Sequence, residues 1–131
     1  MLQKENRLTK VRDFNLLFNH GAWANTANFS LRFLCLEKNK NQIPKKEEEE
    51  VFVKQLRIGF TVGVKISKSA VKRNRLKRQM REIVRLLIKD NQIKNGFYLL
   101  FVAKAGAIGL SYEEITAQII SLLKSVKCLE K

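Results

Sequence analysis

The segment from residue 70 to residue 89 constrains the fold more than any other part of the chain. Apolar residues recur in it every three or four positions, which places them on one side of a helix. They are Leu76, Met80, Ile83, Val84 and Leu87. A helix that is apolar on only one side must bury that side against another element. We therefore predict a helix that includes residues 70–89, packs on a sheet and ends around Asn95 and Gly96, a left-handed stop signal.

The same segment carries seven cations within fourteen residues, offset by one acid, Glu82. The cations are Lys72, Arg73, Arg75, Lys77, Arg78, Arg81 and Arg85. Asn74, Arg78, Arg81 and Arg85 lie opposite the apolar stripe, with Arg75 and Lys77 on the flanks. Like charges at this spacing weaken an isolated helix by roughly 0.2–0.5 kcal/mol per pair. A solvated face usually mixes both signs, so we favour contact with a phosphate backbone, which arginine can hold bidentately.

Three segments have the pattern of strands. Residues 29–36 and 57–64 alternate between two faces, and residues 97–103, "FYLLFVA", are apolar on both faces. In the second strand the apolar face comprises Ile58, Phe60, Val62 and Val64. Its other face is small and polar, with Gly59 and Gly63, so another backbone or a ligand can approach it closely.

Two further helices flank these strands. The first has Thr9 as its expected cap, Gly21 just beyond its end, and an apolar stripe of Val11, Phe14, Leu17 and Phe18. The last opens with a capping box of Ser111 and Glu114, and its stripe comprises Ile115, Ile119, Leu122 and Val126. The order helix, strand, strand, helix, strand, helix predicts an α+β fold with one mixed sheet and helices packed against it.

Residues 37–55 contain the only proline and dense charge without periodicity, so we expect a charged, solvated loop. Val51–Val53 is a candidate extra strand that extends the next one or pairs beside it. The acidic run Glu47–Glu50 lies in this loop. At 131 residues the whole chain, residues 1–131, fits a single domain.

The balance of charged residues indicates which kind of partner the chain binds. The chain has 26 Lys and Arg against 12 Asp and Glu, a net charge of +14. Such a chain most often binds a polyanion, and nucleic acid is favoured over an anionic membrane. The longest apolar run is far too short to span a bilayer and the first ten residues lack a signal-peptide pattern, so a soluble cytoplasmic protein is expected. Cys35 and Cys128 suggest neither a disulfide nor a zinc site.

No catalytic constellation can be assembled from the sequence. His20 is the one histidine and is expected in a turn, while Asp13 and Asp90 belong to separate helices. Paired carboxylates, metal-ligand spacing, a nucleophile elbow and a phosphate-binding glycine loop are all missing. We therefore predict no catalytic residue and no metal site in this chain.

Residues 57–82, "RIGFTVGVKISKSAVKRNRLKRQMRE", resemble the signature of the bacterial ribonuclease P protein subunit. In that family a strand leads through a lysine-containing turn into a helix bearing R-N-R-x-[KR]-R. Here this motif runs from Arg73 to Arg78. "NRLTKVRDFNLLFNHG" resembles the family's first helix, and "FYLLFVAKAGAIGLSYEEI" its last strand and final helix. The resemblance implies a ferredoxin-like relative with a left-handed β-α-β crossover, against the usual hand.

The resemblance also implies a function. In that family the RNA subunit is the catalyst, and it cleaves precursor tRNA at the mature 5′ end with Mg²⁺ bound mainly by the RNA. The implied partners are ribonuclease P RNA and precursor tRNA, without DNA or membrane. The arginine-rich helix docks on the catalytic RNA, which implies contacts by Lys72, Arg73, Asn74, Arg75, Lys77, Arg78, Arg81 and Arg85. The single-stranded 5′ leader is held in a cleft between the sheet and the first helix.

The cleft implies five leader-binding candidates: Phe14, Phe18, Arg32, Lys65 and Lys68. Helical spacing alone favours Phe14 and Phe18 as core residues, whereas the resemblance favours partly exposed rings that stack on bases. Arg32 stands where relatives often have an aromatic ring, and a guanidinium can stack on a base or hold a phosphate. Lys65 and Lys68 either grip the leader backbone or are solvated loop charges.

Two other functions compete with this one. A ribosomal-type protein or another ribonucleoprotein subunit would show similar charge and a similar helix. A protein-only nuclease would need a carboxylate cluster for two metal ions, and the glutamates at 47–50 are the only candidates. A flexible loop is a poor scaffold for such a cluster.

Overall fold

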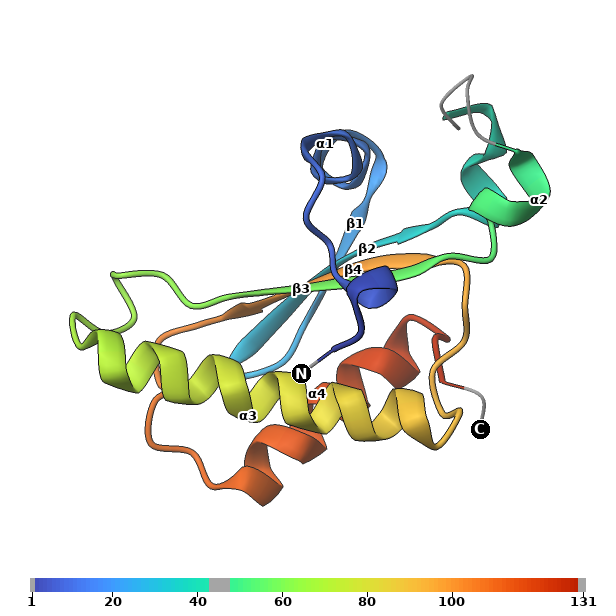
Figure 1. Cartoon of the computed structure of the whole chain (residues 1–131). Coiled ribbons are helices and arrows are strands. Elements are labelled where there is room, and N and C mark those ends of the chain that lie inside the picture. Colours follow the sequence, from blue (N-terminus) through green and yellow to red (C-terminus); the bar gives the residue numbers. More distant parts are fainter. Residues whose placement is uncertain (1, 43–47, 130–131) are drawn as a thin grey trace.

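The computed structural model describes residues 2–42 and 48–129, which form one mixed sheet covered by helices on both faces (Figure 1). The helices are η1 (Lys4–Asn6), α1 (Val11–His20), η2 (Glu37–Gln42), α2 (Glu49–Phe52), α3 (Ala70–Lys89) and α4 (Tyr112–Ser125). The strands are β1 (Ala22–Asn25), β2 (Phe29–Cys35), β3 (Leu56–Thr61) and β4 (Phe97–Ala103). Their order in the sheet is β1-β2-β4-β3. The predicted α+β class is confirmed.

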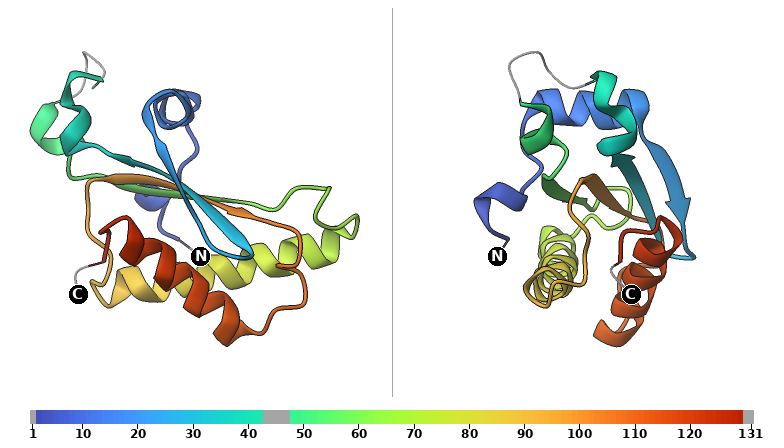
Figure 2. Two further views of the ribbon diagram at one scale, coloured as in Figure 1. Left: turned by 180° about the vertical axis from the view of Figure 1, so that it is seen from behind. Right: turned by 90° about the vertical axis from the view of Figure 1, so that its right-hand side faces the viewer.

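The connection from β3 through α3 to β4 has the unusual hand. β3 and β4 are parallel neighbours, with Leu56 opposite Phe97 and Thr61 opposite Val102. In Figure 1, β3 runs from right to left in front, α3 returns beneath the sheet, and β4 runs from right to left behind β3. The side view in Figure 2 places β4 farther from the original viewer than β3. This path turns counter-clockwise as it recedes, so the crossover is left-handed, as expected from the resemblance.

The sheet separates two apolar clusters. On one face, side chains such as Ile58, Leu99 and Phe101 pack with the stripes of α3 and α4. On the other, Leu34, Tyr98 and Leu100 pack with Leu17 of α1 and Phe52 of α2, and we call this group the α1-side cluster. Strand β4 contributes to both clusters, as expected for a central strand.

The two long helices follow their sequence patterns closely. In α3 the buried residues are Leu76, Met80, Ile83 and Val84, while Leu87 is partly buried against them. Ser69 caps this helix by accepting a hydrogen bond from the Lys72 amide at 3.3 Å. In α4 the capping box of Ser111 and Glu114 is formed as predicted.

The prediction of an extra strand at Val51–Val53 is wrong, because helix α2 covers Glu49–Phe52. Phe52 is buried there and meets the Tyr98 ring edge-on, with 6.0 Å between the ring centroids. Packing of one aromatic residue therefore overrides the strand preference of the valines. The extra strand is instead β1, which pairs antiparallel with β2. Residues 37–55 are thus a loop with two short helices, and residues 43–47 lie outside the described part.

Three helix and strand ends also differ from the prediction. Helix α3 ends at Lys89, with Asp90 as its C-cap, rather than around Asn95 and Gly96. Thr9 does not cap α1, whose N-cap is Lys10 and lacks a side-chain hydrogen bond. β3 ends at Thr61, and Val64 is 64% exposed because the chain has left the sheet by then. Leu8 makes the close approach predicted at Gly59. The Leu8 Cβ lies 3.5 Å from where a Cβ on residue 59 would be. The Leu8 amide donates to the Ile58 carbonyl at 3.0 Å.

Candidate RNA-binding surface

The cations of α3 form a row along the helix, outside its buried stripe of Leu76, Met80, Ile83 and Val84. Lys72, Asn74, Arg75 and Arg78 are exposed, and Arg73, Lys77, Arg81 and Arg85 are half-buried. The row runs from Lys72 to Arg85 within the 20-residue helix, so it extends over roughly 20 Å. All eight predicted contact residues therefore lie on one helix and reach solvent.

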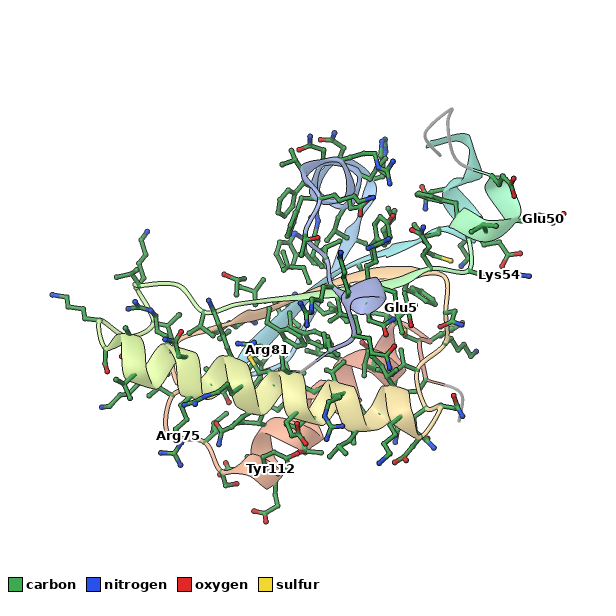
Figure 3. All side chains as sticks on the ribbon, viewed as in Figure 1. Glu5, Glu50, Lys54, Arg75, Arg81 and Tyr112 are labelled. Atoms are coloured by element: carbon green, nitrogen blue, oxygen red, sulfur yellow. The ribbon has the colours of Figure 1, made fainter. Side chains whose placement is uncertain are left out.

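The row has two flanks, and each borders a cavity. Figure 3 shows Arg75 and Arg81 leaving α3 on opposite sides. Lys77 and Arg81 line a cavity of about 290 Å³. Arg7 and three residues of β3, Ile58, Gly59 and Phe60, also line it. Lys72 and Arg75 line another of about 300 Å³ beside the loop at residues 107–110. A strand of RNA on this surface would meet cations on both flanks as well as on the crest.

Two arginines of the row are already engaged within the chain. Arg73 Nη1 donates to the Ser67 carbonyl at 2.8 Å, which ties the helix start to the preceding turn. Arg85 forms a bidentate pair with Glu82, with Nη2–Oε1 at 2.6 Å and Nε–Oε2 at 3.0 Å. The hydrogen bond from Arg85 lowers the pKa of Glu82, and the same bond raises the pKa of Arg85. Within the described residues, no carboxylate pairs with the cations from Lys72 to Arg81, so the uncompensated charge lies in the first three turns.

On the opposite face of the sheet, α1 presents two phenylalanine rings. The rings of Phe14 and Phe18 are stacked, with 6.1 Å between their centroids and 27° between their planes. Phe18 is 51% exposed, whereas Phe14 is half-buried against the α1-side cluster. Neither ring is a fully buried core residue. The partly exposed arrangement expected from the resemblance is therefore present, while Val11 at the head of the stripe lies in solvent.

A buried polar network fixes α1 to the sheet. Asp13 is fully buried, and the Tyr98 hydroxyl lies 3.0 Å from both Asp13 Oδ1 and Gln55 Oε1. Arg57 Nε lies 3.7 Å from Asp13 Oδ2, and Arg12 Nε lies 3.4 Å from Oδ1. Burial, followed by the charge of Asp13, raises the pKa of Tyr98 above its usual range. The sequence analysis missed this network, although a tyrosine in a strand buried on both faces signals a need for a hydroxyl partner.

Arg32 of β2 connects the sheet to the end of α1. Its Nη2 donates to the Phe18 carbonyl at 2.6 Å and its Nε to the Leu17 carbonyl at 3.3 Å. The Leu17 carbonyl also accepts from the Gly21 amide at 2.8 Å, whereas the Phe18 carbonyl lies in the last turn, where carbonyls lack partners within the helix, and Arg32 donates to it. Its Cζ also lies 5.1 Å from the ring centroid of Trp23, a residue the sequence analysis did not single out. Lys65 and Lys68 are exposed in the turn between β3 and α3, and their role stays a prediction.

Functional groups for catalysis are not brought together. Among the described residues there is no group of three His, Cys, Asp or Glu side chains that could hold a metal ion. His20 is exposed at the end of α1, and Cys35 and Cys128 form no disulfide bond with each other. Within the same part of the chain, no helix is long and apolar enough to cross a membrane. What the described residues do bring to the surface is cations on α3 and aromatic rings on α1.

The mixed sheet, with a cationic helix on one face and exposed aromatic residues on the other, defines an α+β protein whose surface suits a polyanion. Comparison with known proteins identifies the group more closely. The family model described as Ribonuclease P matches residues 2–127. The chain belongs to the ribonuclease P protein family.

Individual relatives agree with this assignment. The chain is 35% identical over 129 residues to the ribonuclease P protein component of a Synechococcus strain, covering 98% of this chain and 87% of the relative. It is 38% identical over 124 residues to that of Alkaliphilus oremlandii, covering 95% and 93%. The structure of the Staphylococcus aureus RNase P protein superimposes with a TM-score of 0.73 at 20% identity, covering 97% of this chain and 100% of that one. That last likeness concerns the fold alone.

Proposed function

We propose that this chain is the protein subunit of a ribonuclease P that removes the 5′ leader of precursor tRNA. In this proposal α3 binds the catalytic RNA, and the α1-bearing face binds the single-stranded leader. The observation that carries it is the row of cations on α3, which no carboxylate among the described residues offsets from Lys72 to Arg81. The partners are then ribonuclease P RNA and precursor tRNA, and the cell compartment is the cytoplasm.

Contact with the RNA subunit would rest on phosphate recognition. Arginine forks hold phosphate oxygens through two parallel hydrogen bonds, and a helix with cations on its crest and flanks can follow a backbone for several nucleotides. Each phosphate contact releases counterions, so this binding should weaken steeply with salt. Arg85 is expected to contribute less than Arg78, because Glu82 already offsets its charge.

Binding of the leader would rest on aromatic and cationic groups together. Phe18 offers an exposed ring next to Phe14, and Arg32 lies at the end of the same helix. A ring can stack on any base, which suits leaders of varied sequence. Lys65 and Lys68 would add charge for the leader backbone at the far end of β3.

Catalysis in this proposal belongs to the RNA subunit and to Mg²⁺ bound mainly by it. The protein supplies binding, alignment and charge screening. In this proposal the chain is inactive alone. The enzyme is therefore an endoribonuclease only as a holoenzyme.

The test is cleavage of precursor tRNA by a bacterial ribonuclease P RNA at low magnesium, with and without this chain. We expect faster cleavage at the mature 5′ end only when both are present. A ribosomal-type RNA-binding protein would leave the rate unchanged. A protein-only nuclease would cleave without the RNA. Either result would overturn the proposal.

A further inference from the structure

Trp23 is an exposed aromatic residue that the surfaces described above do not use. It is the only tryptophan of the chain, it lies on the four-residue edge strand β1, and it is 50% exposed. An isolated exposed apolar residue needs no functional explanation. Trp23 is not isolated, however, because the Arg32 guanidinium lies over its ring and also binds the Phe18 carbonyl at the end of α1.

Strand pairing places Trp23 on the same face of the sheet as α1. Trp23 lies opposite Arg32 in the β1–β2 register, and Arg32 lies opposite Leu100 in the β2–β4 register. Residues directly opposite one another in antiparallel strands point to the same face. Leu100 packs in the cluster that α1 covers. The indole therefore extends the α1-bearing face to the edge of the sheet.

Arg32 holds this surface together. Its guanidinium lies 5.1 Å from the indole centroid and donates to the Phe18 carbonyl at 2.6 Å. The guanidinium therefore lies against one side of the indole ring, and half of the residue remains open to solvent. We call Phe18, Trp23 and Arg32 the Trp23 platform, because Arg32 contacts both the indole ring of Trp23 and the backbone of Phe18, the residue that carries the second exposed ring. Stacking on such a platform does not depend on the identity of the base.

We propose that the Trp23 platform binds a nucleobase of single-stranded RNA, stacked on the exposed indole. This inference rests on the proposed function, since it extends the leader site from α1 to the edge of the sheet. Charge favours RNA over a protein partner, because the chain carries a net charge of +14 and Arg32 adds a cation at the platform itself. The short edge strand offers few backbone groups for pairing with a protein strand.

Tryptophan fluorescence gives a direct test, because Trp23 is the only tryptophan in the chain. The holoenzyme, assembled from this chain and ribonuclease P RNA, is titrated with precursor tRNA carrying a leader and with mature tRNA. We expect strong quenching with the leader-bearing RNA and little change with mature tRNA. Equal responses to both RNAs would overturn the inference.

Variants provide an independent measurement. Trp23→Ala should weaken holoenzyme binding of leader-bearing RNA by about tenfold, at the low end of the contribution of one base stack. Trp23→Phe keeps a ring and should restore most of the affinity. Tyr112→Ala serves as the matched control, because Tyr112 is 41% exposed and lies on α4, which covers the opposite face (Figure 3). Thermal unfolding of each variant separates loss of fold from loss of contact.

The outcomes also separate this inference from the proposed function. If wild-type protein gives the holoenzyme no preference for leader-bearing over mature tRNA, both fail. If that preference is present but Trp23→Ala leaves it unchanged, only the Trp23 platform is overturned. An abasic nucleotide scanned along the leader should abolish the Trp23→Ala effect at one position. A uniform effect at all positions would contradict stacking of a particular base.

Discussion

At the scale of single residues, the Tyr98–Asp13 contact determines how firmly α1 is held to the sheet. Both side chains are buried, and the hydroxyl lies 3.0 Å from the carboxylate oxygen. A buried carboxylate needs donors to offset its desolvation. Arg57 and Arg12 supply charge from two sides. Phe14 and Phe18 belong to the same helix, so their placement depends on this network.

Replacing Tyr98 by Phe should lower the free energy of unfolding by about 1 kcal/mol at neutral pH. The effect should depend on pH, because the raised pKa of Tyr98 means that the folded protein keeps a proton that the unfolded chain loses above pH about 10. The contribution of Tyr98 to the free energy of unfolding of the wild-type protein therefore declines as pH rises above that value. Urea unfolding of wild type and Tyr98→Phe across an alkaline pH series measures it. The difference between them should shrink, and a constant difference would contradict the assignment.

Phe18→Ala should reduce affinity for leader-bearing precursor tRNA by about 1–3 kcal/mol and leave affinity for mature tRNA nearly unchanged. The ring is half-exposed, so little stability should be lost. Phe14→Ala should act in the same direction with a larger cost in stability, because Phe14 packs on the α1-side cluster.

The matched control on the same helix is Val11→Ala, since Val11 is 73% exposed and aliphatic. Binding of the two RNAs by the holoenzyme is the measurement. Equal losses for both RNAs at Phe18 would favour a purely structural role.

At the scale of elements, long periodic segments could be predicted from the sequence and short ones could not. The stripes of α3 and α4 repeat over 20 and 14 residues, so helical periodicity is unambiguous in both. Strand β1 and helix α2 have only four residues each, too few for a period to be recognised. Their conformation depends on tertiary partners, namely strand β2 and the ring of Tyr98.

The candidate site likewise has a part that could be predicted from the sequence and a part that could not. The cations of α3 are read directly from sequence, because residues three and four apart share a helix face. The contacts of Arg32 with Phe18 and Trp23 join residues on different elements. No local pattern encodes such contacts, and the same holds for Asp13 and Tyr98, which are 85 residues apart.

The row of cations on α3 leads to a prediction about salt. Arg78→Ala combined with Arg81→Ala should weaken holoenzyme assembly and flatten the slope of log affinity against log salt by about 2, roughly one per lost phosphate contact. The fold should persist, because alanine favours helix and neither arginine belongs to the buried stripe.

The control variant removes the same charge elsewhere, with Lys54→Ala and Lys124→Ala. Both lysines are exposed and lie outside α3. If the control pair changes the salt slope as much as the arginine pair, net charge rather than the α3 surface governs assembly. Circular dichroism of both variants checks the helix content.

At the scale of the whole molecule, the proposed function gives each face of the sheet its own RNA to bind. α3 and α4 cover one face, and α1 lies on the other, so a bound RNA subunit and a bound leader need not compete for the same surface (Figure 1, Figure 2). A protein of net charge +14 placed between two RNAs reduces their mutual repulsion. Its contribution should therefore depend on how well the solution already screens that repulsion.

The chain alone should not cleave RNA, and its effect on the RNA subunit should be largest at low magnesium and moderate ionic strength. As magnesium rises, the divalent ion takes over part of the screening, so rates with and without protein should converge. Single-turnover cleavage of precursor tRNA across a magnesium series, with a protein-only control, measures both statements. Cleavage at the mature 5′ end by the protein alone would contradict the first. A protein effect that stays constant as magnesium rises would contradict the second, and would mean that alignment of substrate rather than screening dominates.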